Sequence, residues 1–208
     1  MKIKQLALAA LLAAAALGSA HAANVASGQL WKVSEAVSQN AILANVPLTP
    51  ADVTFDVNSP FNFSSNVGYS VLDFLNSSAA FNIVGAAGTL SSLLDDANGG
   101  TLMYFTGTVS VTTGQVFTVT HDDGLTLIIG GLDLLFSPGP TSPIQSLATY
   151  TGPSGNLAFQ LVYGECCGAP AVLQVDLPFA AGVPEPETYA LMFGGLGLVG
   201  FMARRRKA

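Results

Sequence analysis

Two adjacent carboxylates, Asp122 and Asp123, stand directly before Gly124. β-favouring residues precede them and an apolar run follows, so the pattern predicts a strand, an acidic turn and a second strand. Adjacent carboxylates repel each other unless backbone N–H groups, solvent or a hard cation offset the charge. Calcium takes carboxylate and loop carbonyl oxygens, and the turn suits it chemically, although the spacing is not that of an EF-hand loop. A solvated turn and a calcium site are both compatible with these residues.

The only two cysteines, Cys166 and Cys167, are also adjacent. Neighbouring Cα atoms lie about 3.8 Å apart, so a disulfide that staples distant segments is excluded. The alternatives are a vicinal disulfide, a pair that awaits other chains, or two buried reduced thiols. A vicinal disulfide would rigidify the loop from Gly164 to Pro170 and place a hard apolar surface beside any ligand. No other cysteine or histidine lies nearby, so a zinc site is not expected.

His121 precedes the acidic pair and is the only histidine between residues 23 and 183. A Ser-His-Asp triad with Asp122 is formally possible, but no Gly-x-Ser-x-Gly elbow accompanies it. Eleven acids offer too many carboxylate pairs to single out a glycosidase, and no phosphate-binding loop appears. We therefore predict no enzymatic activity and interpret His121 as a strand-end residue.

Charge separates the termini of the chain from its middle. Only 7 of 208 residues are basic, and six of these lie at the two ends. Residues 23–183 carry Lys32 and eleven acids, a net charge of −10. Such a surface repels phosphate backbones, so nucleic acid is excluded as a partner, whereas neutral sugars and calcium suit the charge.

The N-terminus has the pattern of a secretory signal peptide. Lys2 and Lys4 precede an apolar run over residues 6–17, and Ala20 and Ala22 form an Ala-x-Ala cleavage site. We predict that residues 1–22 are removed after Ala22, that the Sec translocon is a partner, and that the mature chain lies outside the cytoplasm.

The C-terminus, residues 184–208, is patterned as a second targeting segment. A Pro-Glu-Pro triplet precedes the apolar residues 190–203, and a basic cluster closes the chain: Pro184, Glu185, Pro186, then Arg204, Arg205, Arg206 and Lys207. Fourteen apolar residues fall below the usual ~17–25 for a spanning helix, but Thr188 and Tyr189 extend the run and the basic side chains can snorkel. We predict a transmembrane helix with its basic tail in the cytoplasm.

This order of triplet, Gly-rich apolar helix and basic cluster resembles the PEP-CTERM sorting signal of Gram-negative bacteria. The resemblance implies transient anchoring in the inner membrane facing the periplasm and cleavage near the triplet by an exosortase. Release or attachment at the cell surface follows, often alongside exopolysaccharide production.

Residues 23–183 are expected to form one β-rich domain. Short β-favouring runs recur at residues 53–57, 81–84, 102–111, 115–120, 125–129, 157–163 and 171–175. Hairpin-type turns are predicted at Asn98-Gly99, Thr113-Gly114 and Asp123-Gly124, and residues 32–43 offer one short helix at most. The prediction is an all-β fold, an antiparallel β-sandwich of the jelly-roll kind.

Residues 117–131 resemble the protective-antigen-type β-sandwich, which is related to the flocculin and GLEYA lectin domains. The shared pattern is an aromatic strand, an Asp-Asp-Gly turn and an apolar strand that ends in glycine. In calcium-dependent lectins of this kind the paired Asp residues hold a calcium ion that binds sugar hydroxyls, which implies Ca²⁺ at Asp122 and Asp123. Asp133 and Asn156 are candidates to complete the ligand shell.

Three functions are compatible with these features. The first is an exported module that binds carbohydrate, specifically exopolysaccharide, at the Asp122–Asp123 turn. The alternative is a purely structural envelope or biofilm matrix protein without a small ligand. Ice binding ranks last, because it needs a flat repeated Thr-x-Thr array and only Thr106/Thr108 and Thr118/Thr120 have that spacing.

Overall fold

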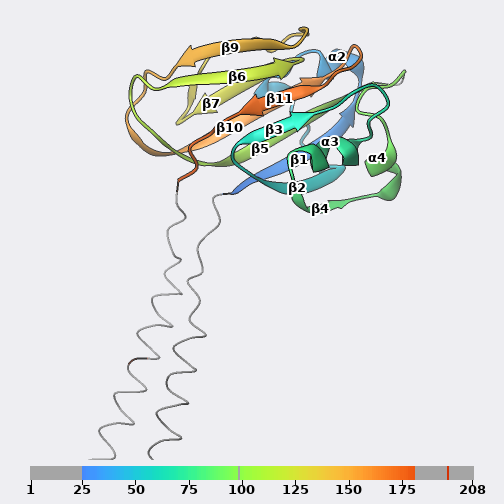
Figure 1. The fold of residues 1–208 in the computed structure, drawn as a ribbon, viewed down its shortest axis with the longest axis horizontal. Coiled ribbons are helices and arrows are strands. Elements are labelled where there is room, and N and C mark those ends of the chain that lie inside the picture. The colour runs from blue at the N-terminus through green and yellow to red at the C-terminus, as the bar shows by residue number, and fades with distance from the viewer. Residues whose placement is uncertain (1–24, 98, 181–195, 197–208) are drawn as a thin grey trace, which may run out of the picture. The chain divides into compact units, whose positions relative to one another are not determined.

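Alternation of apolar and polar side chains builds the strands of the body. Phe117 and Val119 are buried in one predicted strand, whereas Val116 and Thr118 beside them are exposed. The computed structural model describes residues 25–97, 99–180 and 196. Residues 24–180 form one compact unit with its own hydrophobic core, drawn in Figure 1.

The strands form two antiparallel sheets. Sheet A has the order β4 (Phe81–Gly85), β2 (Val53–Asn58), β1 (Val25–Val33), β5 (Gly100–Val111), β10 (Gly155–Glu165), β7 (Leu125–Ile129) and β8 (Leu132–Asp133). Sheet B has the order β3 (Phe61–Ser64), β11 (Val172–Val175), β6 (Val116–Asp122) and β9 (Ile144–Thr149). The predicted antiparallel β-sandwich is confirmed.

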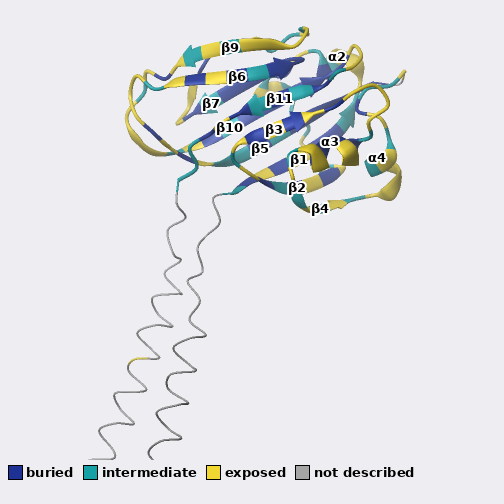
Figure 2. Cartoon of the chain, viewed as in Figure 1, coloured by how far each residue is buried: buried dark blue, intermediate teal, exposed yellow. Residues whose placement is uncertain are grey.

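Buried aromatic rings fill the space between the sheets, as the dark strands of Figure 2 indicate. The Phe105 ring of sheet A lies 5.0 Å from Phe61 and 5.7 Å from Phe63 of sheet B, measured between ring centroids. Phe74 of α3 (Val71–Ser77) stacks on Phe63 at 5.1 Å. These contacts hold the two sheets face to face, so the loops at the ends of the strands have a rigid base.

Two of the predicted hairpins are not hairpins. The turn at Thr113-Gly114 joins β5 of sheet A to β6 of sheet B, and the turn at Asp123-Gly124 joins β6 back to β7 of sheet A. Turn residues indicate that the chain reverses direction. Whether the next strand joins the same sheet or the opposite one depends on the direction in which the apolar side chains beside the turn point. The acidic turn therefore bridges the two layers of the sandwich.

Several elements escaped prediction. These are strands β1, β3, β8 and β9, and helices α3 and α4 (Ala87–Ser91). In β1 the inward position 28 is a glycine because the Phe55 ring occupies its space, so the apolar alternation that marks a strand is interrupted. The segment 32–43 contains one helix, α2 (Glu35–Ser38), but Lys32 itself belongs to β1; a 3-10 turn, η1 (Leu43–Asn45), follows.

The predicted targeting segments lie outside the described residues. This applies to the signal peptide with Ala20 and Ala22, to the triplet Pro184, Glu185 and Pro186, to the basic residues 204–207, and to the predicted transmembrane segment apart from residue 196. In the part of the chain that the structure describes, no helix has the length and apolar character needed to cross a membrane.

Candidate functional site

The acidic pair lies where β6 ends and the chain crosses from sheet B to sheet A. Asp122 is the last residue of β6 and pairs with Val172 of β11, and a cis peptide bond links it to Asp123. The two residues are only 5% and 4% exposed. The strand end and the inter-sheet turn thus hold two carboxylates beside each other at one end of the sandwich.

The Asp123 carboxylate ties three loops together. Its Oδ2 accepts a hydrogen bond from the Cys166 backbone N–H at 2.8 Å, and its Oδ1 accepts one from the Thr141 N–H at 3.1 Å. Burial raises the pKa of Asp123, while these two backbone hydrogen bonds act in the opposite direction. Asp123 therefore has a structural role whether or not a cation binds.

The Asp122 carboxylate has a different environment. No N–H group of the described residues donates to it, and burial, followed by the charge of Asp123, raises its pKa to about 7. It lines a cavity of about 340 Å³ whose other walls are Asp123, Pro140, Thr141, Ser142, Pro143, Cys167, Gly168, Ala169 and Pro170. A hydrogen bond between the two carboxyl groups raises the pKa of Asp122 further. Asp122 is thus an acid that contacts its neighbour Asp123 and lines an open cavity.

A vicinal disulfide joins Cys166 to Cys167, whose Cα atoms are 3.8 Å apart. Cys166 is buried, and Cys167 is exposed at the cavity wall with a positive φ of 67°. The sulfur atoms lie near the Asp123 carboxylate, but in a disulfide neither is a thiolate that would bind a soft metal. Hard carboxylate and hydroxyl oxygens are therefore the ligands that this cavity offers.

A further buried acid, Glu165, lies behind the pair and was not identified from the sequence. The Tyr163 hydroxyl donates to the Asp122 carbonyl oxygen, and its oxygen lies 2.8 Å from Glu165 Oε2. Burial raises the pKa of Glu165 to about 10, so its carboxyl is protonated at neutral pH. The available signal was an acidic residue two positions after a tyrosine at the end of β10. Its burial behind the Asp122–Asp123 turn depends on the packing of β6 against β10, which the spacing along the chain does not contain.

Glu165→Gln should flatten the pH dependence of stability in the metal-free protein. The folded-state pKa is raised, so above pH ~4.3 the unfolded chain holds fewer protons, and stability falls as the pH rises toward 10. This group contributes up to about 1.4 kcal/mol per pH unit. Thermal melts in a chelator between pH 8 and 9.5 should show a fall of several degrees in wild type that Glu165→Gln lacks. Glu35→Gln, at an exposed position, is the control. If the melting temperature falls equally with pH in wild type and both variants, Glu165 is not a buried, neutral carboxyl in the folded protein.

His121 is the penultimate residue of β6, in agreement with its interpretation as a strand-end residue, and it is fully buried. Its Nδ1 lies 2.6 Å from the Asp123 carbonyl oxygen, and its Nε2 lies 3.0 Å from Ser146 Oγ on β9. A carbonyl oxygen can only accept, so Nδ1 carries the proton and Nε2 accepts from the serine in the neutral ring. The Asp122 carboxylate is not part of this chain of contacts, so the formally possible triad is not assembled.

Neither candidate for an additional ligand is brought to the acidic pair. Asp133 pairs with Ile128 near the far end of β7, and its carboxylate accepts from the Leu135 N–H. Asn156 lies nine residues before Glu165 on β10, about 30 Å along the strand. Calcium takes six to eight oxygen ligands. Asp122 and Asp123 can supply part of such a set, and the open cavity leaves room for water or ligand oxygens.

Comparison with known proteins identifies the tail and the fold. The model of the PEP-CTERM protein-sorting motif matches residues 182–207. The PA14 domain of the MpAFP antifreeze protein is similar over 76% of this chain and 85% of that one, with 24% identity and a TM-score of 0.51. A PA14 sugar-binding domain from an RTX adhesin covers 76% of this chain and 93% of its own, with 20% identity and a TM-score of 0.51. The body has a PA14-like fold.

The sorting motif implies that the PA14-like body belongs to an exported precursor, anchored in the membrane of a Gram-negative bacterium and processed by an exosortase. At these identities the structural likeness shows the fold alone. No curated protein matches the chain. What the PA14-like body binds must therefore be argued from its own residues.

Proposed function

We propose that the protein is an exported carbohydrate-binding module whose PA14-like body holds a calcium ion at Asp122 and Asp123, and that the ion binds hydroxyl groups of exopolysaccharide. The observation that carries the proposal is that the two adjacent carboxyl groups of Asp122 and Asp123 line the same open cavity. The sugar-binding PA14 domain of the RTX adhesin supports the same class of function by its fold.

The charge of the body supports a cation at this place. Lys32 is the only basic residue between residues 23 and 183, and its Nζ donates to the carbonyl oxygens of Leu93 and Leu94 at 2.7 Å. No lysine or arginine of the described residues is therefore left to neutralise the acidic pair. A divalent cation with hydroxyl oxygens as its outer ligands matches both the charge and the openness of the cavity.

The vicinal disulfide supports a sugar as the second ligand. Cys167 and the prolines at 140, 143 and 170 form a rigid, mostly apolar rim around the two carboxylates. Sugar rings have apolar faces and polar edges, so they suit a hard cation surrounded by such a rim.

Calorimetry on residues 24–180, the compact unit with its own core, tests the proposal. We expect heat from calcium alone, and heat from glucose, mannose or galactose only when calcium is present. A chelator should abolish the sugar response. If calcium binds without any sugar response, or neither gives heat, the carbohydrate-binding proposal is wrong and the structural matrix role is the better description.

A further inference from the structure

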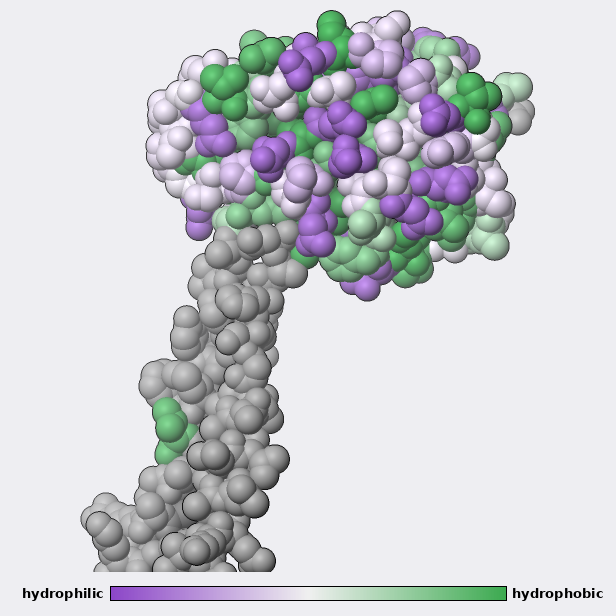
Figure 3. All heavy atoms as spheres, in the orientation of Figure 1, coloured by the Kyte–Doolittle hydropathy of each residue, from purple (hydrophilic) through white to green (hydrophobic). Residues whose placement is uncertain are grey.

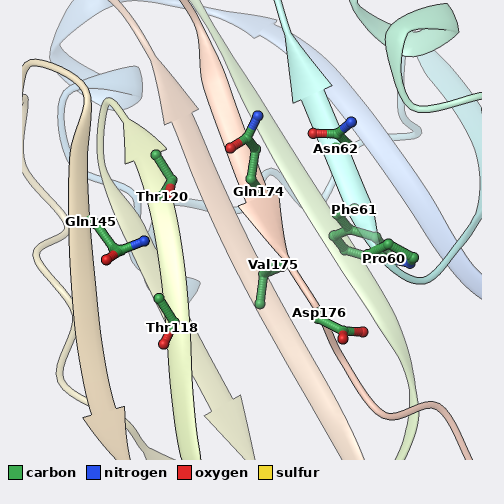
Figure 4. Close-up of a pocket in the computed structure, with 9 residues that line it drawn as sticks. All are labelled: Pro60, Phe61, Asn62, Thr118, Thr120, Gln145, Gln174, Val175 and Asp176. Atoms are coloured by element: carbon green, nitrogen blue, oxygen red, sulfur yellow. The ribbon is translucent and has the colours of Figure 1, made fainter.

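The outer face of sheet B carries a row of polar side chains that cross all four strands. Strand pairing places Asn62 of β3 opposite Gln174 of β11, Gln174 opposite Thr120 of β6, and Thr120 opposite Gln145 of β9. Figure 4 shows these side chains standing on four neighbouring strands. At about 4.8 Å per strand the row is about 14 Å long, which exceeds a single sugar ring.

These four side chains have no hydrogen-bond partner within the described residues. On the outer face of sheet A several polar side chains pair with one another: Ser27 and Asn82 donate to Asp56, and Gln160 donates to the Tyr104 hydroxyl. Three amides and a hydroxyl on sheet B thus keep all their donors and acceptors available. Sugar hydroxyls, which both donate and accept, are matched by such groups.

The surface around the row is shallow and nearly neutral. It contains a hollow of about 300 Å³, which Phe61 and Val175 help to line. Asp176 is the only charged residue among those that line this hollow. Figure 3 shows hydrophilic residues gathered over this face with hydrophobic ones between them. An acidic polymer would be repelled by a body with a net charge of −10, whereas a neutral polymer would not.

The row is continuous with the acidic site. Thr118, Thr120 and Asp122 project on the same side of β6, and Asp122 is two residues, about 7 Å, from the row. The loops that line the acidic cavity lead directly into the flanking strands: Pro143 precedes β9, and Pro170 lies just before β11. The row and the acidic cavity are therefore neighbours at the same end of β6, β9 and β11.

We infer that the row Asn62, Gln174, Thr120 and Gln145 is an extended subsite for a neutral polysaccharide chain that continues from the calcium-bound sugar at Asp122 and Asp123. This inference rests on the proposed function. It adds that the protein binds the interior of a polymer, because several successive sugar units contact the sheet face. Affinity then increases with chain length.

The test compares the sugars glucose and mannose with gluco- and manno-hexasaccharides, in calcium, on residues 24–180. We expect a hexasaccharide to bind at least about tenfold more tightly than its monosaccharide. The triple variant Asn62→Leu, Gln145→Met, Gln174→Met should lose this gain and keep the affinity for the monosaccharide. Gln29→Met, an exposed strand glutamine on sheet A, is the matched control and should behave as wild type. In NMR spectra the three side-chain amide signals should shift with the hexasaccharide only.

The outcomes separate this inference from the proposed function. Hexasaccharides that bind no more tightly than monosaccharides, or a triple variant that keeps the gain, would overturn the extended subsite while the calcium-bound sugar stands. Absence of any sugar binding by wild type would overturn both. A folded triple variant is verified by a melting temperature close to that of wild type.

Discussion

Asp122→Asn is expected to lower the affinity for sugar in the presence of calcium by at least about 100-fold, while the metal-free protein stays folded. Outer-shell residues of metal sites typically contribute 10–100-fold to metal affinity, so a direct ligand should contribute at least as much. The Asp122 side chain is hydrogen-bonded to the Asp123 carboxylate, and the N–H₂ group of asparagine can donate to the same carboxylate. Calorimetry and thermal melts in a chelator measure the two effects.

The sign of the stability change follows from the pKa. The carboxyl of Asp122 has a raised pKa of about 7, so its ionised form destabilises the folded protein as the pH rises through that value. We therefore expect Asp122→Asn to melt at a higher temperature than wild type at pH 8 in a chelator, and at a similar temperature near pH 4. Retention of calcium-dependent sugar binding by this variant would show that the site is elsewhere.

Asp123→Asn is the matched comparison because its carboxylate is structurally engaged. Asparagine keeps one acceptor oxygen but turns an N–H₂ group toward one of the two backbone N–H donors, Cys166 or Thr141. An unpaired buried donor costs about 1–3 kcal/mol. We expect Asp123→Asn to lose both calcium binding and stability. Asp122→Asn should lose calcium binding alone, so comparing the two variants shows that Asp122 acts as a ligand and that Asp123 also supports the fold.

Gly124→Ala is expected to destabilise the protein by about 3 kcal/mol and to weaken calcium binding. A Cβ at position 124 would lie 2.0 Å from the Pro138 carbonyl oxygen, and this backbone atom cannot move without displacing the 138–143 loop that lines the cavity. For a domain of this size the loss corresponds to a fall in melting temperature of about 10 °C.

Gly139→Ala provides the control within the same loop. Nothing lies within 4 Å of a Cβ at position 139, so the substitution should change stability by less than about 0.5 kcal/mol. Equal melting temperatures for the two variants would show that the close approach of Gly124 to Pro138 does not constrain the turn.

Local patterns in the sequence predicted seven strands correctly because each is a run of β-favouring residues, and several of the runs alternate between the two faces. In β6 the exposed Val116 alternates with the buried Phe117, which is the signature of a half-buried strand. Strands β1 and β3 were missed because one has glycine at an inward position and the other is four residues long. Their strand character depends on neighbours such as Phe55 and Phe105, which lie far away along the chain.

The acidic pair could be singled out from the sequence, but not its surroundings. Adjacent carboxylates before a glycine are a local feature, so Asp122 and Asp123 stand out in any reading of the chain. Thr141, Tyr163 and Cys166 approach them only because the turn crosses between the sheets, which local turn chemistry did not specify. The two predicted hairpins failed for the same reason.

By itself the sequence determined the sorting address, the charge of the body, the β-rich class and the acidic turn, because each is encoded in residues that are neighbours along the chain. The tertiary structure alone decided which of the two acids is tied to loop backbone, that Glu165 is buried behind them, and that four polar side chains form a row across sheet B. Strand register and sheet packing join residues more than 40 positions apart, and no pattern of spacing along the chain contains that information.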